Sequence, residues 1–179
     1  MINMKNKSLI IFDWDGTLMD SVGLIVDAMR HAAQANGLTV TDDATKSIIG
    51  IALVDAFPML FPNHSDKYDE LLATYSEYYV KHCDNDKLFE GIKELIQDLH
   101  AQGKTLAIAT GKKRKGLQRV LPNSGIQAFF TLTKTADETA GKPNPLMLQA
   151  ILSETNKSIE EAVFVGDSIH DIRMANAIQ

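Results

Sequence analysis

The stretch Leu9-Ile10-Ile11-Phe12-Asp13-Trp14-Asp15-Gly16-Thr17-Leu18 decides how this chain of 179 residues folds. Its four consecutive apolar residues predict a short strand buried on both faces, as in a parallel sheet covered by helices. Ligands bind such sheets beyond the carboxyl ends of the strands, where Asp13 would lie. Because Asp13 and Asp15 would repel each other, the stretch favours a bound cation or a shared proton. The alternative is an acidic strand end followed by a turn at Gly16.

The rest of the chain divides into a helical part and a part in which strands and helices alternate. Between Leu18 and Asp86 the spacing of apolar residues predicts helices and no strand. From Gly91 onward, apolar runs predict further strands at 105–109, 129–132 and 162–165, with helices between them. This alternation predicts an α/β fold with a doubly wound, Rossmann-like parallel sheet. We expect residues 1–18 and 87–179 to form the core, and residues 19–86 to form an all-helical insertion.

Local signals give several boundaries of the expected helices. Asp20 or Ser21 can cap the first helix of the insertion. Pro58 should break the apolar segment 51–61 into short helices or a packed loop. Near the end of the chain, Asn144 can cap a helix whose first residue is a proline.

Composition limits the class of protein. The chain is 45% apolar and 23% charged, which is typical of a globular protein that stays in solution. Its net charge of −5 argues against nucleic acid or an anionic membrane as the main partner. A single cysteine, Cys83, excludes an intramolecular disulfide, and no signal peptide or membrane-spanning run is recognisable. We therefore expect a cytoplasmic protein.

Polar side chains end three of the expected strands. Asp13 and Asp15 follow the first strand, Thr110 ends the second, and Asp167 follows the last. In a parallel sheet these ends converge on one edge. Asp171 lies one helical turn beyond Asp167. Carboxylate oxygens suit Mg²⁺, whereas the scarcity of Cys and of clustered His argues against zinc.

The same residues, with Lys142 in the loop Gly141-Lys142-Pro143, resemble the four motifs of the haloacid dehalogenase-like superfamily of hydrolases. The run from Gly16 to Ser21 and the helical insertion look like the phosphoglycolate phosphatase-like group. The resemblance implies that residues 19–86 are a cap that closes over the site and sets specificity. It also implies a Mg²⁺-dependent phosphatase that acts on a small phosphorylated metabolite.

The resemblance further implies a role for each motif residue. Asp13 would be the nucleophile that forms an aspartyl phosphate, and Asp15 the general acid and base. The transferring phosphoryl group would be held by Thr110, Gly111 and Lys142. The metal would be held by Asp13, Asp167 and the backbone carbonyl of Asp15, with Asp171 as an auxiliary acid. These residue types suit the chemistry, because a carboxylate can attack phosphorus while cations stabilise the equatorial oxygens.

Other functions use the same residues. A sugar phosphomutase shares every core residue and would be revealed by a need for a bisphosphate activator. Dehalogenation and phosphonate cleavage are disfavoured because neither needs the second carboxylate, Asp15. A catalytically weak regulatory protein that binds metal or phosphate is the non-enzymatic alternative. As partners we expect a small phosphorylated metabolite, no nucleic acid and no membrane, with the chain as a monomer or homodimer.

Several of these residues also have purely structural interpretations. Lys142 could pair with a surface acid, Thr110 could cap a strand end, and Asp167 could favour a helix start. The basic run 112–115 is expected to be a solvated helix face rather than a phosphate attractor. Packing or surface roles, or no assigned role, are expected for His31, His64, His82, Tyr75, Tyr78, Tyr79 and Trp14.

The C-terminal end differs from the family pattern. Relatives usually continue past the last motif with another strand and helix, whereas this sequence stops at Gln179. We therefore expect the C-terminal strand to be missing and one strand edge to be exposed. Lower stability and self-association would follow.

Overall fold

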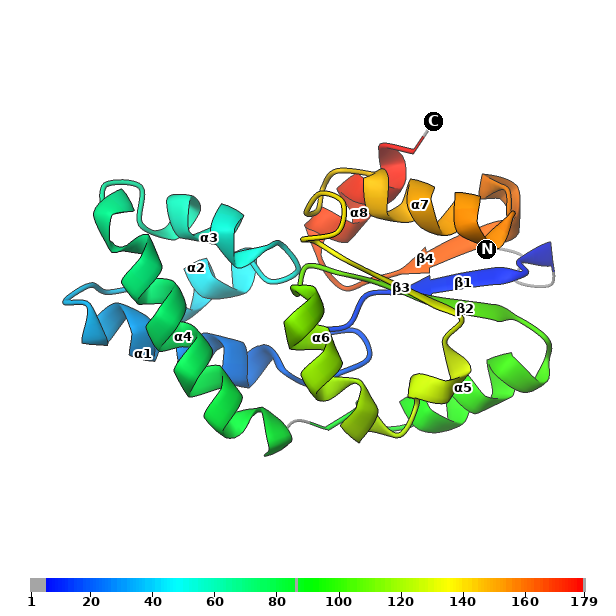
Figure 1. Cartoon of the computed structure of the whole chain (residues 1–179), viewed down its shortest axis with the longest axis horizontal. Coiled ribbons are helices and arrows are strands. Elements are labelled where there is room, and N and C mark those ends of the chain that lie inside the picture. Colours follow the sequence, from blue (N-terminus) through cyan, green and yellow to red (C-terminus); the bar gives the residue numbers. More distant parts are fainter. Residues whose placement is uncertain (1–5, 86, 179) are drawn as a thin grey trace.

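The computed structural model describes residues 6–85 and 87–178 and contains a four-stranded parallel sheet (Figure 1). Its order is β3-β2-β1-β4, and all four residues of β1 are buried. This confirms the predicted doubly wound α/β fold. The expected boundary residue Asp86 and the terminal Gln179 lie outside the described residues. The strands are β1 (Leu9–Phe12), β2 (Thr105–Thr110), β3 (Leu132–Thr135) and β4 (Ala162–Val165).

Helices cover both faces of the sheet (Figure 1). Successive side chains of a strand point to opposite faces. Ile10 and Phe12 therefore join a core with α5 (Ile92–Ala101) and α6 (Arg114–Val120). Leu9 and Ile11 join a second core with α7 (Leu146–Thr155) and α8 (Ile169–Asn176). Each such buried side chain stabilises the fold by roughly 1.5–3 kcal/mol, so β1 is the rigid centre of the molecule.

Four α-helices lie between β1 and α5, to one side of the sheet (Figure 1). We call them the helical insertion: α1 (Val22–Ala35), α2 (Asp42–Ser47), α3 (Leu53–Leu60) and α4 (Tyr68–His82). Small residues on the buried face of α1, including Ala28 and Ala32, let α4 pack closely against it. Among the described residues from 22 to 85 there is no strand, as the sequence predicts.

Among residues 6–85 and 87–178, none of the helices is long and apolar enough to cross a bilayer. Short 3-10 helices complete the secondary structure of these residues. The 3-10 helices are Ser65–Lys67, Cys83–Asn85, Pro122–Ser124, Gln127–Phe129 and Ile159–Glu161.

The two chain segments that join the helical insertion to the sheet lie side by side. Met19 forms an antiparallel bridge with Leu88. The backbone N–H of Asp20 donates to the carbonyl of Lys87 at 2.9 Å, and that of Phe89 donates to Leu18 at 3.1 Å. The entry and exit of the insertion are therefore hydrogen-bonded to each other.

Three local predictions were wrong. The third strand is not 129–132 but 132–135, because Phe130 packs edge-to-face on Phe12, at 6.4 Å between ring centroids, under the sheet. The segment 51–61 does contain a short helix, α3, as predicted, but Pro58 lies inside this helix and does not break it. Ser21 occupies the N-cap position of α1, yet its side chain makes no capping hydrogen bond and bonds to Asp15 instead.

One edge of the described sheet is β4. Its residues are only partly buried, and Val165 is 37% exposed, in contrast to the fully covered β1. Edge strands of this kind offer unpaired backbone groups to other chains. The expected self-association stays a prediction.

Candidate active site

The carboxyl ends of the strands bring the expected site residues together. Asp13 directly follows β1, and its backbone N–H donates to the carbonyl of Val165 in β4 at 2.9 Å. Thr110 ends the neighbouring strand β2. Asp13 and Thr110 are 1% and 0% exposed, so both are fixed by the surrounding core. Asp167, two residues beyond β4, is exposed to solvent at the same edge.

Lys142 lies between two buried carboxylates. Its Nζ is 2.6 Å from Oδ1 of Asp13 and 2.6 Å from Oδ1 of Asp171. Burial raises the pKa of Asp13, the charge of Lys142 opposes this shift and the charge of Asp171 adds to it, so that the pKa is about 7. Burial alone would lower the pKa of Lys142, but attraction to the two acids raises it above its ordinary value. Lys142 therefore stays a cation at the end of the central strand.

Asp171 orients Lys142 and also starts a helix. Its Oδ2 accepts hydrogen bonds from the backbone N–H of Ser168 at 3.0 Å and from the Ser168 hydroxyl at 2.6 Å. This is the reciprocal capping arrangement at the beginning of α8. Because one oxygen is used for the cap and the other for Lys142, Asp171 fits the auxiliary role better than that of a primary ligand.

The acidic residues can also hold a cation. Asp13, Asp167 and Asp171 each offer an oxygen, and these oxygens lie within 4.8 Å of one another. Asp13 Oδ2 is buried and, among the described residues, has no hydrogen-bond partner. A buried, unpartnered carboxylate oxygen is costly unless a cation or proton meets it. The donor set is all oxygen, which fits Mg²⁺.

Gly16 makes room for Asp167 beside Asp13. A Cβ at Gly16 would lie 2.4 Å from Oδ2 of Asp167, and the backbone there has φ +77°. Only glycine accommodates both conditions without strain. The hydroxyl of Thr17 donates to Oδ1 of Asp167 at 2.8 Å, which holds the exposed carboxylate in place.

Asp15 is held by two donors. Its Oδ1 accepts from the Ser21 hydroxyl at 2.6 Å and pairs with Lys112 Nζ at 3.0 Å. Lys112 was missed, because the whole run 112–115 was predicted to be a solvated face. That prediction is wrong for Lys112, which turns inward, and for Arg114, which pairs with Glu138. Side chains two residues apart in an extended strand point the same way. Had this alternation been continued past Thr110, it would have placed Lys112 on the same side of β2 as Thr110.

The other residues considered from sequence serve mainly as packing. Trp14 is fully buried, and Tyr75 stacks on Tyr79 with 5.9 Å between ring centroids. His31 and His82 both pack on the ring of Tyr78. The hydroxyl of Tyr79 also makes a polar contact, since it accepts a hydrogen bond from Lys112 Nζ at 2.9 Å.

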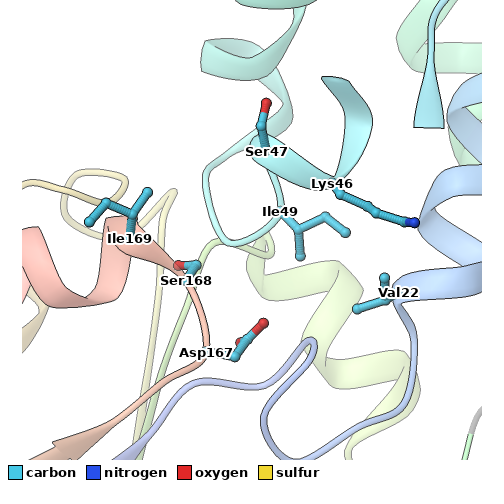
Figure 2. Close-up of a pocket in the computed structure, with 7 residues that line it drawn as sticks. All are labelled: Val22, Lys46, Ser47, Ile49, Asp167, Ser168 and Ile169. Carbon is cyan, nitrogen blue, oxygen red and sulfur yellow. The ribbon is translucent and has the colours of Figure 1, made fainter. Parts of the chain in front are cut away.

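A cavity of about 340 Å³ opens between the helical insertion and the loop before α8 (Figure 2). Asp167 joins this cavity to the buried acids. Lys46 of α2 supplies the only cationic side chain among its lining residues, and the described residues offer it no ion pair. Figure 2 shows the lining: Val22, Lys46, Ser47, Ile49, Asp167, Ser168 and Ile169.

Residues 10–179 match the family model described as haloacid dehalogenase-like hydrolase. The chain belongs to this family. Pyrophosphatase PpaX from Halalkalibacterium halodurans is 34% identical over 169 residues, which cover 91% of this chain and 76% of that protein. Membership in this hydrolase family and similarity to its phosphatases confirm the enzyme class expected from the sequence.

Solved structures of the family agree with the fold. A haloacid dehalogenase-like hydrolase from Bacteroides fragilis superposes with a TM-score of 0.87 at 28% identity, covering 96% of this chain and 83% of that one. A protein assigned as a phosphoglycolate phosphatase, from Lactobacillus plantarum, gives 0.86 at 27% identity, covering 96% and 82%. The similarity spans both the sheet and the helical insertion.

Proposed function

We propose that this family member is a Mg²⁺-dependent phosphatase that transfers the phosphoryl group of a small phosphorylated metabolite to Asp13 and then to water. The observation that carries the proposal is the buried Asp13 carboxylate, which ends the central strand beside Lys142 and within reach of Asp167. A nucleophile, a cation for the phosphoryl oxygens and a set of metal-ligating oxygens thus share one strand edge.

Each residue then has a step. Asp13 attacks phosphorus as the bond to the leaving oxygen breaks, and Asp15 gives that oxygen a proton. Asp15 next takes a proton from the water that hydrolyses the aspartyl phosphate. Lys142 and the Thr110 hydroxyl stabilise the charge on the equatorial oxygens.

Three groups would hold the metal: the side chains of Asp13 and Asp167 and the backbone carbonyl of Asp15, with Asp171 nearby as an auxiliary acid. When bound, Mg²⁺ supplies charge neutralisation between the anionic nucleophile and the anionic phosphate. The unpartnered Oδ2 of Asp13 supports this assignment.

We infer that the helical insertion acts as a cap over the leaving group. The leaving group would occupy the cavity in Figure 2. Among the residues that line it, Lys46 carries the one positive charge and Asp167 the one negative charge. A second anionic group on a small substrate would complement Lys46. Phosphoglycolate has a carboxylate there and pyrophosphate a second phosphate, in keeping with the names of the relatives described above.

Phosphate release tests the reaction. We expect p-nitrophenyl phosphate to be hydrolysed in Mg²⁺ but not in chelator, without any bisphosphate activator. Asp13→Asn should abolish release, whereas Asp98→Asn, which changes an exposed carboxylate on α5, should not. Activity that survives chelation or Asp13→Asn would contradict the proposal.

A substrate panel tests the role of Lys46. For phosphoglycolate and pyrophosphate, Lys46→Met should lower kcat/KM about tenfold, the loss of one partly solvated charge interaction. Ethyl phosphate, with its uncharged leaving group, should be unaffected. The control Lys81→Met removes an exposed lysine from α4. Equal losses on all three substrates would show that Lys46 does not recognise the leaving group.

A further inference from the structure

Lys112 connects three parts of the molecule. It follows β2, its side chain is 12% exposed, and its Nζ lies 3.0 Å from Oδ1 of Asp15. The same Nζ donates to the Tyr79 hydroxyl at 2.9 Å and lies 4.5 Å from the centroid of the Tyr79 ring. Asp15 belongs to the sheet side, whereas Tyr79 belongs to α4 of the helical insertion. The ammonium group is thus shared between the catalytic acid and the cap.

The cap side of this contact is fixed by packing. Tyr79 is 8% exposed and stacks on Tyr75 with an interplanar angle of 14°. Its hydroxyl therefore moves only if α4 moves. A cation over an aromatic face and hydrogen-bonded to its hydroxyl is held in one place by both contacts. The position of the Lys112 ammonium group therefore depends on where α4 lies relative to the sheet.

The Asp15 side of the contact determines which oxygen can carry a proton. Lys112 and the Ser21 hydroxyl both meet Oδ1 of Asp15. Among the contacts of the described residues, neither donor reaches Oδ2. Two donors on one oxygen fix the rotation of the carboxyl group and leave Oδ2 for the proton that goes to the leaving oxygen.

We propose that Lys112 is a positioning residue for Asp15, and that its contact with Tyr79 makes this positioning depend on the cap. The inference rests on the proposed function, because it assigns Asp15 the proton-transfer step. With α4 in the position seen here, Lys112 holds Oδ1 and Oδ2 faces the leaving oxygen. When α4 moves away, Lys112 loses one of its partners and Asp15 loses its fixed orientation.

Two other roles for Lys112 make different predictions. A cation that binds the transferring phosphate would matter for every phosphate ester and would raise KM. A purely structural ion pair of this partly exposed kind would stabilise the fold by about 1 kcal/mol or less and leave the chemistry alone. A positioning residue should instead matter selectively in the first step, where an alkoxide leaving oxygen needs a proton; kcat/KM reports this step because it ends with release of the leaving group.

The experiment compares two leaving groups. p-Nitrophenolate leaves without a proton, whereas the alkoxide from phosphoglycolate or ethyl phosphate needs one. Lys112→Met should lower kcat/KM for the alkyl phosphates about 10- to 100-fold, part of the 10²–10⁴ that general acid catalysis supplies. For p-nitrophenyl phosphate, whose leaving oxygen needs no proton, kcat/KM should stay within about threefold, because this quantity excludes the later step in which Asp15 acts on water. Lys112→Arg should restore most of the alkyl-phosphate activity.

Two more variants complete the test. Tyr79→Phe keeps the ring and removes only the hydroxyl, so it should lower alkyl-phosphate turnover selectively, by about two- to tenfold. Lys115→Met removes an exposed lysine of the same basic run and should leave kcat/KM for both kinds of substrate unchanged. If Lys112→Met does not fold, Tyr79→Phe and Lys112→Arg still decide the question.

The outcomes separate this proposal from the proposed function. A loss selective for alkyl phosphates, rescued by arginine, supports the positioning role. Equal losses on both leaving groups, or a raised KM, would assign Lys112 to phosphate binding and overturn it. No kinetic change would leave only a structural ion pair and overturn it as well. A wild-type protein that hydrolyses neither substrate in Mg²⁺ would overturn the phosphatase function itself.

Discussion

A Cβ placed at Gly111 would lie 2.4 Å from the carbonyl oxygen of Gly50. Gly50 follows α2 in the helical insertion, and Gly111 follows β2 in the sheet. The two parts of the molecule therefore meet backbone to backbone beside Thr110. Gly111, expected next to the phosphate, also makes room for the cap.

Gly111→Ala should hold this contact open. The backbone atoms of Gly50 cannot yield as a flexible side chain would, so the insertion must shift outward. We expect kcat/KM to fall about tenfold or more, because small displacements at such a contact misplace the reacting groups. The matched control is Gly116→Ala in α6, where a Cβ would meet nothing closer than 3.9 Å. That variant should keep its activity; an equal loss in both would refute the steric explanation.

The buried pairs of Lys142 should contribute far more to stability than exposed ones. Lys142→Met leaves Asp13 and Asp171 facing each other without a cation, which should cost about 3–5 kcal/mol. Lys157→Met removes the partly exposed partner of a solvent-exposed acid, Glu161, and should lower stability far less. Urea denaturation in chelator measures both free energies of unfolding. Similar values for the two variants would contradict the buried arrangement.

Stability without metal should fall as the pH rises. The pKa of Asp13 is about 7 in the folded protein, against an ordinary value of 3.8 for the solvated carboxyl, so the folded protein binds the extra proton between these values. The stabilisation that this proton on Asp13 gives the folded protein is therefore complete below pH 3.8 and is lost as the pH rises through 7. In chelator, Tm should drop between about pH 4 and pH 7, and Mg²⁺ should reverse the drop. Asp13→Asn should remove most of this dependence; an unchanged drop would point to other groups.

Gly16→Ala should weaken metal binding. The new methyl group would displace Asp167, whose Oδ2 is 2.4 Å from the Cβ position, and would strain a backbone at φ +77°. We expect the Mg²⁺ concentration for half-maximal activity to rise about 10- to 100-fold, as when supporting groups around a metal are lost. Gly23→Ala in α1, where a Cβ meets nothing within 4 Å, is the control. An unaltered Mg²⁺ requirement would place the ion elsewhere.

The sheet and most of its site residues could be predicted because the signals are local. An apolar run that ends in Asp13, or in Thr110, specifies both a buried strand and the position of a polar group at its end. β3 was misplaced for a physical reason. It lies at a sheet edge and contains polar residues such as Lys134, whereas the apolar run before it fills the core under the sheet.

The residues that sequence reasoning missed depend on partners far away in the chain. Lys112 meets Tyr79, which is 33 residues earlier in the sequence, and Asp15, which follows another strand. Lys46 gains its importance only from the cavity that α2 forms with the loop before α8. No periodicity encodes such meetings. Ser21 shows the same limit, because a residue chosen as a helix cap gives its hydroxyl to Asp15.

The bridge between Met19 and Leu88 gives the molecule a single hinge. Two independent connections would let the helices tilt, twist and slide over the sheet. Connections that are hydrogen-bonded to each other turn together, so the motion reduces to a swing about one axis. Asp15 and Ser21 flank this axis, so they would change position little, whereas parts of the insertion farther from the axis would move more. A swing that carries α4 outward would therefore admit the substrate and, by separating Tyr79 from Lys112, release the carboxyl group of Asp15 in the same movement.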